Sequence, residues 1–216
     1  TTLVLALTAL LPANESVIIG KNSPFRGAPV ISTITLPKPS INLAFPFEQL
    51  LMERGEKPEL SSESLKIDRL SQILWAGYGI ANAQNLTRTV DSIDNGYSIL
   101  LYVITTNSVY VYVPNDHSLA KIMDSDIRTR LAAAANRDKN AYISGTTIVI
   151  AGSPRMAGHK QPREGRFFMQ FEAGKVAQNM EIAGITQNVG FILNEKLDRS
   201  KISALLRMPS GFEPVC

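Results

Sequence analysis

The sequence is poor in the residues that build metal centres and disulfides. Its 216 residues include a single cysteine, Cys216, and two histidines, His117 and His159. One cysteine excludes an internal disulfide and every cysteine-based metal site. The histidines lie far apart and no HExxH motif occurs, which excludes a zinc protease of that type. We therefore predict that the protein holds no metal ion.

Motifs for covalent hydrolysis and for phosphate binding are missing as well. There is no GxSxG elbow of a serine hydrolase, and no P-loop with its Lys-Ser/Thr pair. No side chain is marked out as a general acid or base. Tyr97 and His117 are the nearest candidates, and we interpret both as structural. The catalytic residues therefore stay unassigned.

The chain also has no large excess of positive or negative charge. The formal net charge is only +3, and lysine and arginine are scattered among aspartate and glutamate along the whole chain. Nucleic-acid binding is therefore not expected. The densest basic stretch, Ser153–Arg166, is interpreted as a solvated loop, because loops are usually polar and exposed.

Long apolar runs are absent, so no integral membrane segment is predicted. The longest run, Thr1–Leu11, is shorter than the roughly 20 apolar residues that a membrane-spanning helix needs. It is similar to the centre of a secretion signal, and the alternative is an ordinary buried strand or helix. We expect residues 1–32 to form a signal remnant and an extended arm, which favours a periplasmic or exported protein over a cytoplasmic one.

What the chain does contain is enough apolar sequence for a core, at 44% of its residues. The clearest helix is predicted at residues 65–81, where Leu70, Ile73 and Leu74 share a face. Residues 164–186 form a long pattern that is apolar on more than one side, which predicts a helix inside the fold or in a subunit interface. Shorter helices are predicted at residues 45–55, at 124–136 with Asp124 or Ser125 as N-cap, and at 198–208.

Strands are predicted between these helices. Ser98–Thr105 and Ser108–Val113 are joined by a short turn, which is typical of a hairpin. Further strands are predicted at residues 146–152 and 188–193, and a short extended piece precedes Pro37 and Pro39. Strands in the middle of the chain with helices around them predict an α+β fold, in which helices pack on a central, mostly antiparallel sheet.

Three stretches of the chain form a recognisable set: Leu70–Ile80 (LSQILWAGYGI), Arg88–Val103 (RTVDSIDNGYSILLYV) and Glu172–Gly184 (EAGKVAQNMEIAG). Together, in this order and spacing, they resemble the nitroreductase-like family of FMN proteins. The most similar branch is that of the SagB-type dehydrogenases, which include the azoline oxidases of peptide natural products. The resemblance covers residues 33–215, so we expect one nitroreductase-like domain at residues 33–216.

The resemblance implies a homodimer with one FMN at each of two sites between the subunits. It implies ping-pong chemistry, in which NAD(P)H or another organic donor reduces the flavin and an acceptor then takes up the hydride through flavin N5. The substrate would be a small molecule or a peptide. Its identity would be set by loops, which we place at Ser153–Arg166 and Asn115–Asp126.

The family's first flavin motif, close to R-R-S-x-R, corresponds to Glu53–Lys57 (ERGEK). In the family these side chains hold the FMN phosphate and ribityl chain, which implies Arg54, Gly55 and Lys57 as cofactor-binding positions. Lys57 is expected at the N1–O2 edge of the ring. Glu53 replaces an arginine and Gly55 replaces the serine, and a carboxylate beside a phosphate is repulsive.

The second motif, close to R-T-x-P-S-A-x-N, corresponds to Arg88–Asn95. Ser92 and Asn95 match it by position. The resemblance implies that Asn95 hydrogen-bonds the flavin ring and that Ser92 lies at the face of the ring. Asp91 replaces a proline, and Asp94 adds a second negative charge.

A third element of the family places backbone N–H groups near flavin N5 and O4. Here it corresponds to Leu193, Asn194 and Glu195, and it requires no particular side chain. A fourth element, a basic C-terminal segment near the phosphate, would follow Cys216. We therefore expect the nitroreductase-like domain to be truncated at its C-terminus.

Two functions are compatible with these observations. The first is an FMN-dependent oxidoreductase. The alternative is a flavin-free relative that serves as a scaffold or binding module, which the replacements at Glu53, Gly55 and Asp91 favour. Two lost phosphate pairs, at about 1.5–3 kcal/mol each, would weaken FMN binding about 100-fold or more.

Overall fold

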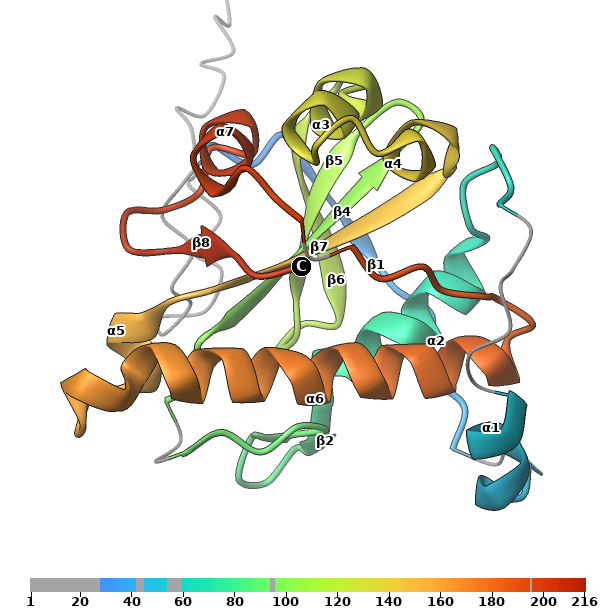
Figure 1. The fold of residues 1–216 in the computed structure, drawn as a ribbon. Coiled ribbons are helices and arrows are strands. Elements are labelled where there is room, and N and C mark those ends of the chain that lie inside the picture. The colour runs from blue at the N-terminus through green and yellow to red at the C-terminus, as the bar shows by residue number, and fades with distance from the viewer. Residues whose placement is uncertain (1–27, 42–44, 54–59, 94–95, 195) are drawn as a thin grey trace, which may run out of the picture.

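The computed structural model describes residues 28–41, 45–53, 60–93, 96–194 and 196–216. Over these residues a central sheet lies between two layers of helices (Figure 1). None of the helices in this part of the chain is long and apolar enough to cross a bilayer. Residues 1–27 lie outside the described residues, so the interpretation of that stretch as a signal remnant and arm stays a prediction.

The sheet has six strands in the order β1-β6-β5-β4-β7-β8, and every neighbouring pair is antiparallel. The predicted α+β fold with a central antiparallel sheet is therefore confirmed. A separate pair, β2 and β3, forms a small ribbon. The bounds are β1 Ser32–Thr35, β2 Ile80–Asn82, β3 Thr87–Arg88, β4 Ile99–Thr105, β5 Val109–Val113, β6 Ser118–Met123, β7 Thr146–Gly152 and β8 Glu213–Pro214.

Helices cover both faces of the sheet. On one face lie α2 and α6, and α6 runs across the whole width of the sheet (Figure 1). On the other face lie α3 and α7. The bounds are α1 Phe47–Glu53, α2 Ile67–Tyr78, α3 Arg128–Ala134, α4 Lys139–Ile143, α5 Pro154–Ala157, α6 Gly165–Thr186 and α7 Arg199–Leu205, with a 3-10 turn at Pro162–Glu164.

Strand β4 is the centre of the core because both of its faces are covered. Six of its seven residues are buried, and alternate side chains enter opposite layers. Leu101 and Val103 pack with α2 and α6, whereas Leu100, Tyr102 and Ile104 pack towards α3 and α7. This explains why the strand is a continuous apolar run in the sequence.

Helix α6 buries one stripe and exposes another apolar one, as the sequence predicted. Its buried side chains include Met169, Val176 and Met180, at helical spacing. The α2 backbone approaches this stripe closely at Gly77, where a Cβ atom would lie 2.4 Å from Cγ of Met180. On the opposite side Phe167 is 60% exposed.

The predicted strand at residues 188–193 is wrong. Helix α6 ends in a Schellman motif, in which the N–H of Val189 donates to the carbonyl of Gly184 and the N–H of Asn188 donates to that of Ile185. Asn188 takes the left-handed conformation, with φ of 54°, that this ending requires. Phe191 then packs over Gly184. The segment thus folds back on α6, and the free side of β7 pairs with β8 instead.

Both segments that we expected to be substrate loops contain regular structure. Within Asn115–Asp126 the chain forms β6, which pairs with β1 and with β5. Within Ser153–Arg166 it forms α5, whose Ala157 is buried in the core beside α6, so the interpretation of this stretch as a solvated loop is wrong in part. Each segment has too few apolar residues for their spacing in the sequence to reveal its strand or helix.

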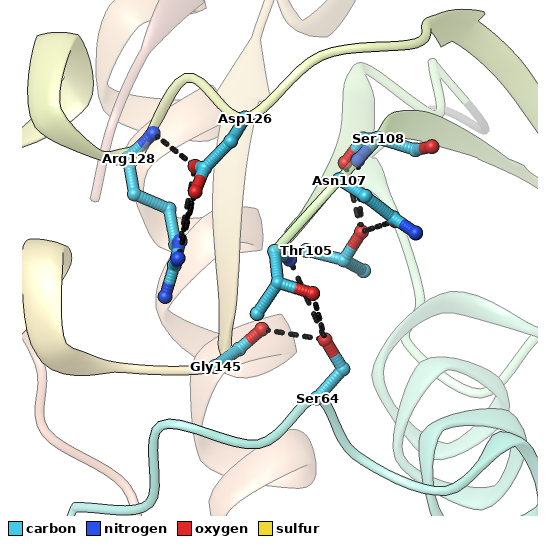
Figure 2. Close-up of polar contacts among 8 residues, drawn as sticks. Ser64, Thr105, Asn107, Ser108, Asp126, Arg128 and Gly145 are labelled. Atoms are coloured by element: carbon cyan, nitrogen blue, oxygen red, sulfur yellow. Dashed lines mark hydrogen bonds and ion pairs between the residues drawn. The ribbon is translucent and has the colours of Figure 1, made fainter.

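The N-cap of α3 also differs from the prediction. The helix begins after Ile127, whereas Asp124 or Ser125 was expected as the cap. Asp126 instead accepts a hydrogen bond from the backbone N–H of Arg128 at 3.0 Å and forms an ion pair with its guanidinium at 2.7 Å (Figure 2). The side chain that satisfies a free N–H at the start of the helix is therefore that of Asp126, and not that of Asp124 or Ser125.

The β4–β5 hairpin is confirmed, and its turn is joined through Ser64 to Gly145, the residue before β7, because the N–H of Thr106 donates to Oγ of Ser64 at 3.4 Å. Within the turn, Thr105 donates its hydroxyl to Asn107 at 3.1 Å and its N–H to the carbonyl of Ser108 at 2.9 Å. Ser64, just before α2, donates to the carbonyl of Gly145 at 3.0 Å (Figure 2). These bonds hold one end of the sheet against the segment that leads into α2.

His117 joins three elements through its imidazole ring. Nδ1 lies 2.8 Å from the hydroxyl of Tyr112 on β5, and Nε2 lies 2.8 Å from Oγ of Ser71 on α2 and 2.9 Å from the carbonyl of Pro37. A neutral ring with its proton on Nε2 satisfies this set, because Tyr112 can donate to Nδ1. Burial lowers the pKa of His117 below its ordinary value. The structural interpretation of this side chain agrees with these contacts.

Leu101→Ala is expected to destabilise the fold by about 2–5 kcal/mol, because it opens a cavity in the layer beneath α6. Leu101 is 1% exposed. The measurement is the free energy of unfolding in urea. Leu86→Ala, at a leucine that is 54% exposed, is the matched control and should change stability by less than about 0.5 kcal/mol. Equal effects of the two substitutions would contradict the assignment of the core.

The stability of the wild-type protein is expected to fall as the pH drops below about 6.5, the ordinary pKa of histidine. The pKa of His117 is lower in the folded state, so the unfolded chain binds the proton first and is favoured at acid pH. The loss should level off once the pH lies below the folded pKa. Urea midpoints at several pH values check this, and His117→Asn should flatten the dependence. An unchanged slope in that variant would show that other groups cause it.

Candidate functional site

The structure describes three of the eight predicted cofactor-binding residues, namely Ser92, Leu193 and Asn194. Arg54, Gly55, Lys57, Asn95 and Glu195 lie outside the described residues. The geometry of the candidate site is therefore built from the described segments on either side of these positions. No group of three or more metal-ligating side chains occurs among the residues that the structure describes.

Ser92 directs its hydroxyl into the protein. It lies between β3 and β4, and its Oγ donates to a carboxylate oxygen of Glu172 on α6 at 2.9 Å. Oγ of Ser92 also accepts the backbone N–H of Tyr97 at 3.0 Å. Ser92 thus bridges the two ends of the segment that contains residues 94 and 95. Its predicted position at the face of a flavin stays a prediction.

The acceptor of this bond, Glu172, is the most buried carboxylate among the described residues, at 2% exposure. Besides Ser92, it accepts the hydroxyl of Tyr78 at 2.5 Å and the hydroxyl of Ser98 at 3.0 Å. The backbone N–H of Ser98 also points at it, at 3.3 Å. Four donors from α2, from the segment after β3 and from the start of β4 therefore converge on one carboxylate. An ionised carboxylate only accepts, so it suits such a set.

Tyr78 is held as a donor in this cluster. Burial, and then the nearby Glu172 carboxylate, raise the pKa of Tyr78 well above its usual range. Its hydroxyl oxygen accepts the N–H of Ile99 at 3.2 Å, which connects α2 to the first residue of β4. Arg88 stacks on the rings of Tyr78 and Tyr97, at 4.3 and 5.0 Å from their centroids. Tyr97 therefore has a packing role in the structure.

Asp91, which replaces the proline of the family motif, has a cationic partner. Lys175 of α6 binds the Asp91 carboxylate at 2.7 Å and also donates to its backbone carbonyl at 2.6 Å. The hydrogen bond and the charge of Lys175 lower the pKa of Asp91. The additional negative charge in this turn is thus neutralised locally, and the backbone is held where a proline ring would have stiffened it.

The segment after α6 is fixed through a side chain. Asn194 donates from Nδ2 to Asp138 at 2.7 Å, and its Oδ1 accepts the N–H of Lys196 at 2.9 Å. Asp138 is itself the N-cap of α4. The N–H groups of Leu193 and Asn194 donate to no carbonyl of a described residue. The role of these N–H groups near flavin N5 and O4 stays a prediction.

Two further residues of the family-like stretches have structural partners. Asn179 of α6 donates to the carbonyls of Ala76 at 3.2 Å and Thr89 at 3.3 Å, which connects α6 to α2 and to the segment after β3. Glu53, at the end of α1, accepts a hydrogen bond from Gln49 one helical turn earlier, at 2.7 Å. Its carboxylate is therefore engaged along its own helix.

The residue that the sequence analysis missed is Glu172. It lay within the stretch that carried the resemblance, but only as part of a helix pattern. The sequence did contain a sign of its burial. Glu172 falls three residues after Met169 and four before Val176, and thus on the apolar stripe of α6. A charged residue at a core position needs several donors around it.

An open hollow of about 490 Å³ lies away from this cluster. It is lined from β6 and α7, by residues that include Ile122, Leu205 and Arg207, on the sheet face opposite α6. Because Ser92, Leu193 and Asn194, the described members of the predicted set, do not line it, we do not assign the candidate site to this hollow.

Comparison with known proteins gives the same family as the sequence motifs. The model of the nitroreductase family matches residues 57–216. A protein of Methanocaldococcus jannaschii that is assigned as a nitroreductase is 29% identical over 178 residues, which are 76% of this chain and 89% of that protein. The match of the family model includes the described elements from α2 to β8 and leaves out β1 and α1.

Solved structures share this fold. A crystal structure of a Ralstonia eutropha protein, also assigned as a nitroreductase, has a TM-score of 0.75 at 22% identity and covers 89% of this chain and 92% of its own. A Desulfovibrio desulfuricans protein with the same assignment, solved in complex with FMN, has a TM-score of 0.55 at 18% identity and covers 79% and 82%. With the family model matching well over half of its residues, the chain belongs to the nitroreductase family.

Proposed function

We propose that the protein is an FMN-dependent oxidoreductase of the SagB-type branch of this family. The observation that carries the proposal is the neutralisation of Asp91 by Lys175. Asp91 departs from the second flavin motif, and its pairing with Lys175 offsets one of the two negative charges that this turn adds. A free carboxylate beside the cofactor would oppose the extra electron density of the reduced ring.

The residues that would hold FMN come from three segments. Arg54 and Lys57 would bind the phosphate and the N1–O2 edge of the ring, and Asn95 would hydrogen-bond the ring. The backbone N–H groups of Leu193–Glu195 would serve N5 and O4, which is supported by the anchored side chain of Asn194. When bound, FMN would supply two-electron transfer through N5, and the protein would orient it and tune its electronics.

The proposed reaction is a ping-pong exchange of two electrons. NAD(P)H, or another organic donor, would enter first and leave oxidised, and a small-molecule or peptide acceptor would follow. The described residues around the candidate site contribute hydrogen-bond donors and a positioned turn, and Tyr97 and His117 are both engaged in packing. The role of the chain is therefore to bind and orient both partners.

We further propose that the working form is a homodimer. Large apolar side chains are exposed at both ends of α6. Phe167 and Phe171 lie in its first two turns. Phe47, Leu51 and Met52 lie on α1, which packs beside the other end of α6 (Figure 1). Phe167 and Phe171 lie stacked, with ring centroids 6.2 Å apart. Aromatic residues are enriched at the centres of interfaces, and an exposed pair such as Phe167 and Phe171 is therefore typical of one.

A second candidate function is a flavin-free scaffold or binding module. One observation favours it: Glu53 stands where the family has a phosphate-binding arginine, and its carboxylate is engaged with Gln49 of its own helix. Loss of that arginine removes a bidentate phosphate partner, which lysine cannot fully replace. The two functions differ in a single measurable property, the affinity for FMN.

The purified protein is expected to bind FMN with one flavin per chain. Titration of FMN with the protein, followed by flavin fluorescence and visible absorption, measures the affinity and the stoichiometry. A protein that stays colourless and leaves the spectrum of added FMN unchanged would exclude the oxidoreductase and leave the scaffold function.

Asn95→Ala and Lys57→Ala are each expected to weaken FMN binding about tenfold, the worth of one hydrogen bond to a charged or strongly polar partner. Lys66→Ala, at an exposed lysine just before α2, is the matched control and should leave the affinity unchanged. If all three variants bind FMN like the wild type, the flavin lies elsewhere on the protein.

The homodimer is tested by light scattering coupled to size exclusion. The expected mass is twice the 23.6 kDa of one chain. Replacing both Phe167 and Phe171 by serine should shift the population towards the monomer, since two exposed aromatic anchors are lost. The control is Leu86→Ser, at an exposed leucine of the β2–β3 ribbon. A wild-type monomer at micromolar concentration would rule out this interface.

A further inference from the structure

The bonds of Glu172 are distributed over both ends of one short segment. Ser92 lies before residues 94 and 95, and Ser98 lies after them. Tyr97 is connected to the same carboxylate through Ser92, whose oxygen accepts its N–H. A single side chain of α6 therefore fixes the distance between the two backbone segments that flank Asn95 in the sequence.

A packing role alone does not explain this glutamate. The neighbouring positions of the buried stripe are Met169, Val176 and Met180, and a similar apolar side chain at position 172 would fill the layer without a desolvation cost. A buried carboxylate is tolerated only where its hydrogen bonds are nearly complete, and such networks hold a single conformation of the groups they join. The network of Glu172 joins Ser92 and Ser98, which lie at the two ends of the segment between β3 and β4.

Helix α6 holds the same turn from outside. Lys175 follows Glu172 by three residues, so the two side chains lie on adjacent turns of one helix face. Its amine binds both the carboxylate and the backbone carbonyl of Asp91. The turn is thus attached to α6 at Asp91, Ser92 and Ser98, whose backbone would otherwise be free to move as a surface loop.

We propose that Glu172 is a positioning residue of the flavin site, which acts by holding the described segments on either side of residues 94 and 95, at Ser92 and at Tyr97–Ser98, in the arrangement that receives the cofactor. The inference rests on the proposed function. Glu172 itself is buried and hydrogen-bonded to Tyr78 of α2, so it acts on FMN only through the segments that it holds.

The test compares Glu172→Gln with the wild type in three measurements on the full chain. Glutamine keeps the shape of the side chain but replaces one acceptor oxygen by an NH2 donor. That donor would face the hydroxyl or N–H groups that donate to the carboxylate in the wild type. Hydrogen exchange of the unliganded protein should become faster at the amides of Tyr97 and Ser98, with the middle of β4 unchanged. FMN should bind about tenfold more weakly, the worth of one lost hydrogen bond to a charge.

The third measurement is the reduction potential of the bound flavin, which should shift because the groups around the ring are displaced. If Glu172 were merely structural, Glu172→Gln would lower the melting temperature but leave the FMN affinity and the reduction potential unchanged at temperatures where the variant is folded. This result would overturn the proposal. Glu164→Gln, at an exposed glutamate just before α6, is the matched control. Where Glu172→Gln does not fold, Ser98→Ala removes one hydroxyl donor and leaves the carboxylate in place.

The two proposals fail in different ways. A wild-type protein that binds no FMN removes the proposed function, and with it the cofactor role of Glu172. Unchanged exchange at Tyr97 and Ser98 in Glu172→Gln shows that the carboxylate does not hold the turn, whether or not FMN binds. Faster exchange together with normal FMN affinity and potential also overturns the positioning role.

Discussion

The carboxylate of Glu172 lies in the apolar layer between α6 and the sheet, where an uncompensated charge would be strongly unfavourable. Four donors converge on it, from Tyr78 of α2, from Ser92 and from Ser98, the residue before β4. This requirement ties α2 and both ends of the segment between β3 and β4 to one helix. The position of α6 across the sheet is set by apolar packing at Met169 and Val176. The candidate site is built on both of these interactions.

The second interaction that holds this region is the ion pair between Asp91 and Lys175. The turn differs from the family motif by an aspartate in place of a proline, and the helix that packs beside it supplies Lys175 as a partner. A proline would have stiffened the turn through its ring, whereas Asp91 and Lys175 hold it through two hydrogen bonds. The change therefore replaces a local constraint by a tertiary one.

Much of the fold could be predicted because its main elements carry strong local patterns. The period of α2 and α6, and the apolar runs of β4 and β7, identified the helices and the central strands. The weaker elements were missed: β6 lies in a stretch with little apolar alternation, and β8 has only two residues. The expected strand at 188–193 failed because a Schellman ending and the packing of Phe191 on Gly184 turned the chain back.

For the site, the sequence by itself determined the family, the order of the flavin motifs and the positions at which this chain departs from them. Those features are local strings of residues, and they can be recognised without coordinates. Only the tertiary structure decided that Ser92 faces Glu172, that Lys175 neutralises Asp91, and that Asn194 is held by Asp138. The partners in these pairs are separated by 56 to 84 residues, and only the packing of helices on a sheet brings them within hydrogen-bonding distance.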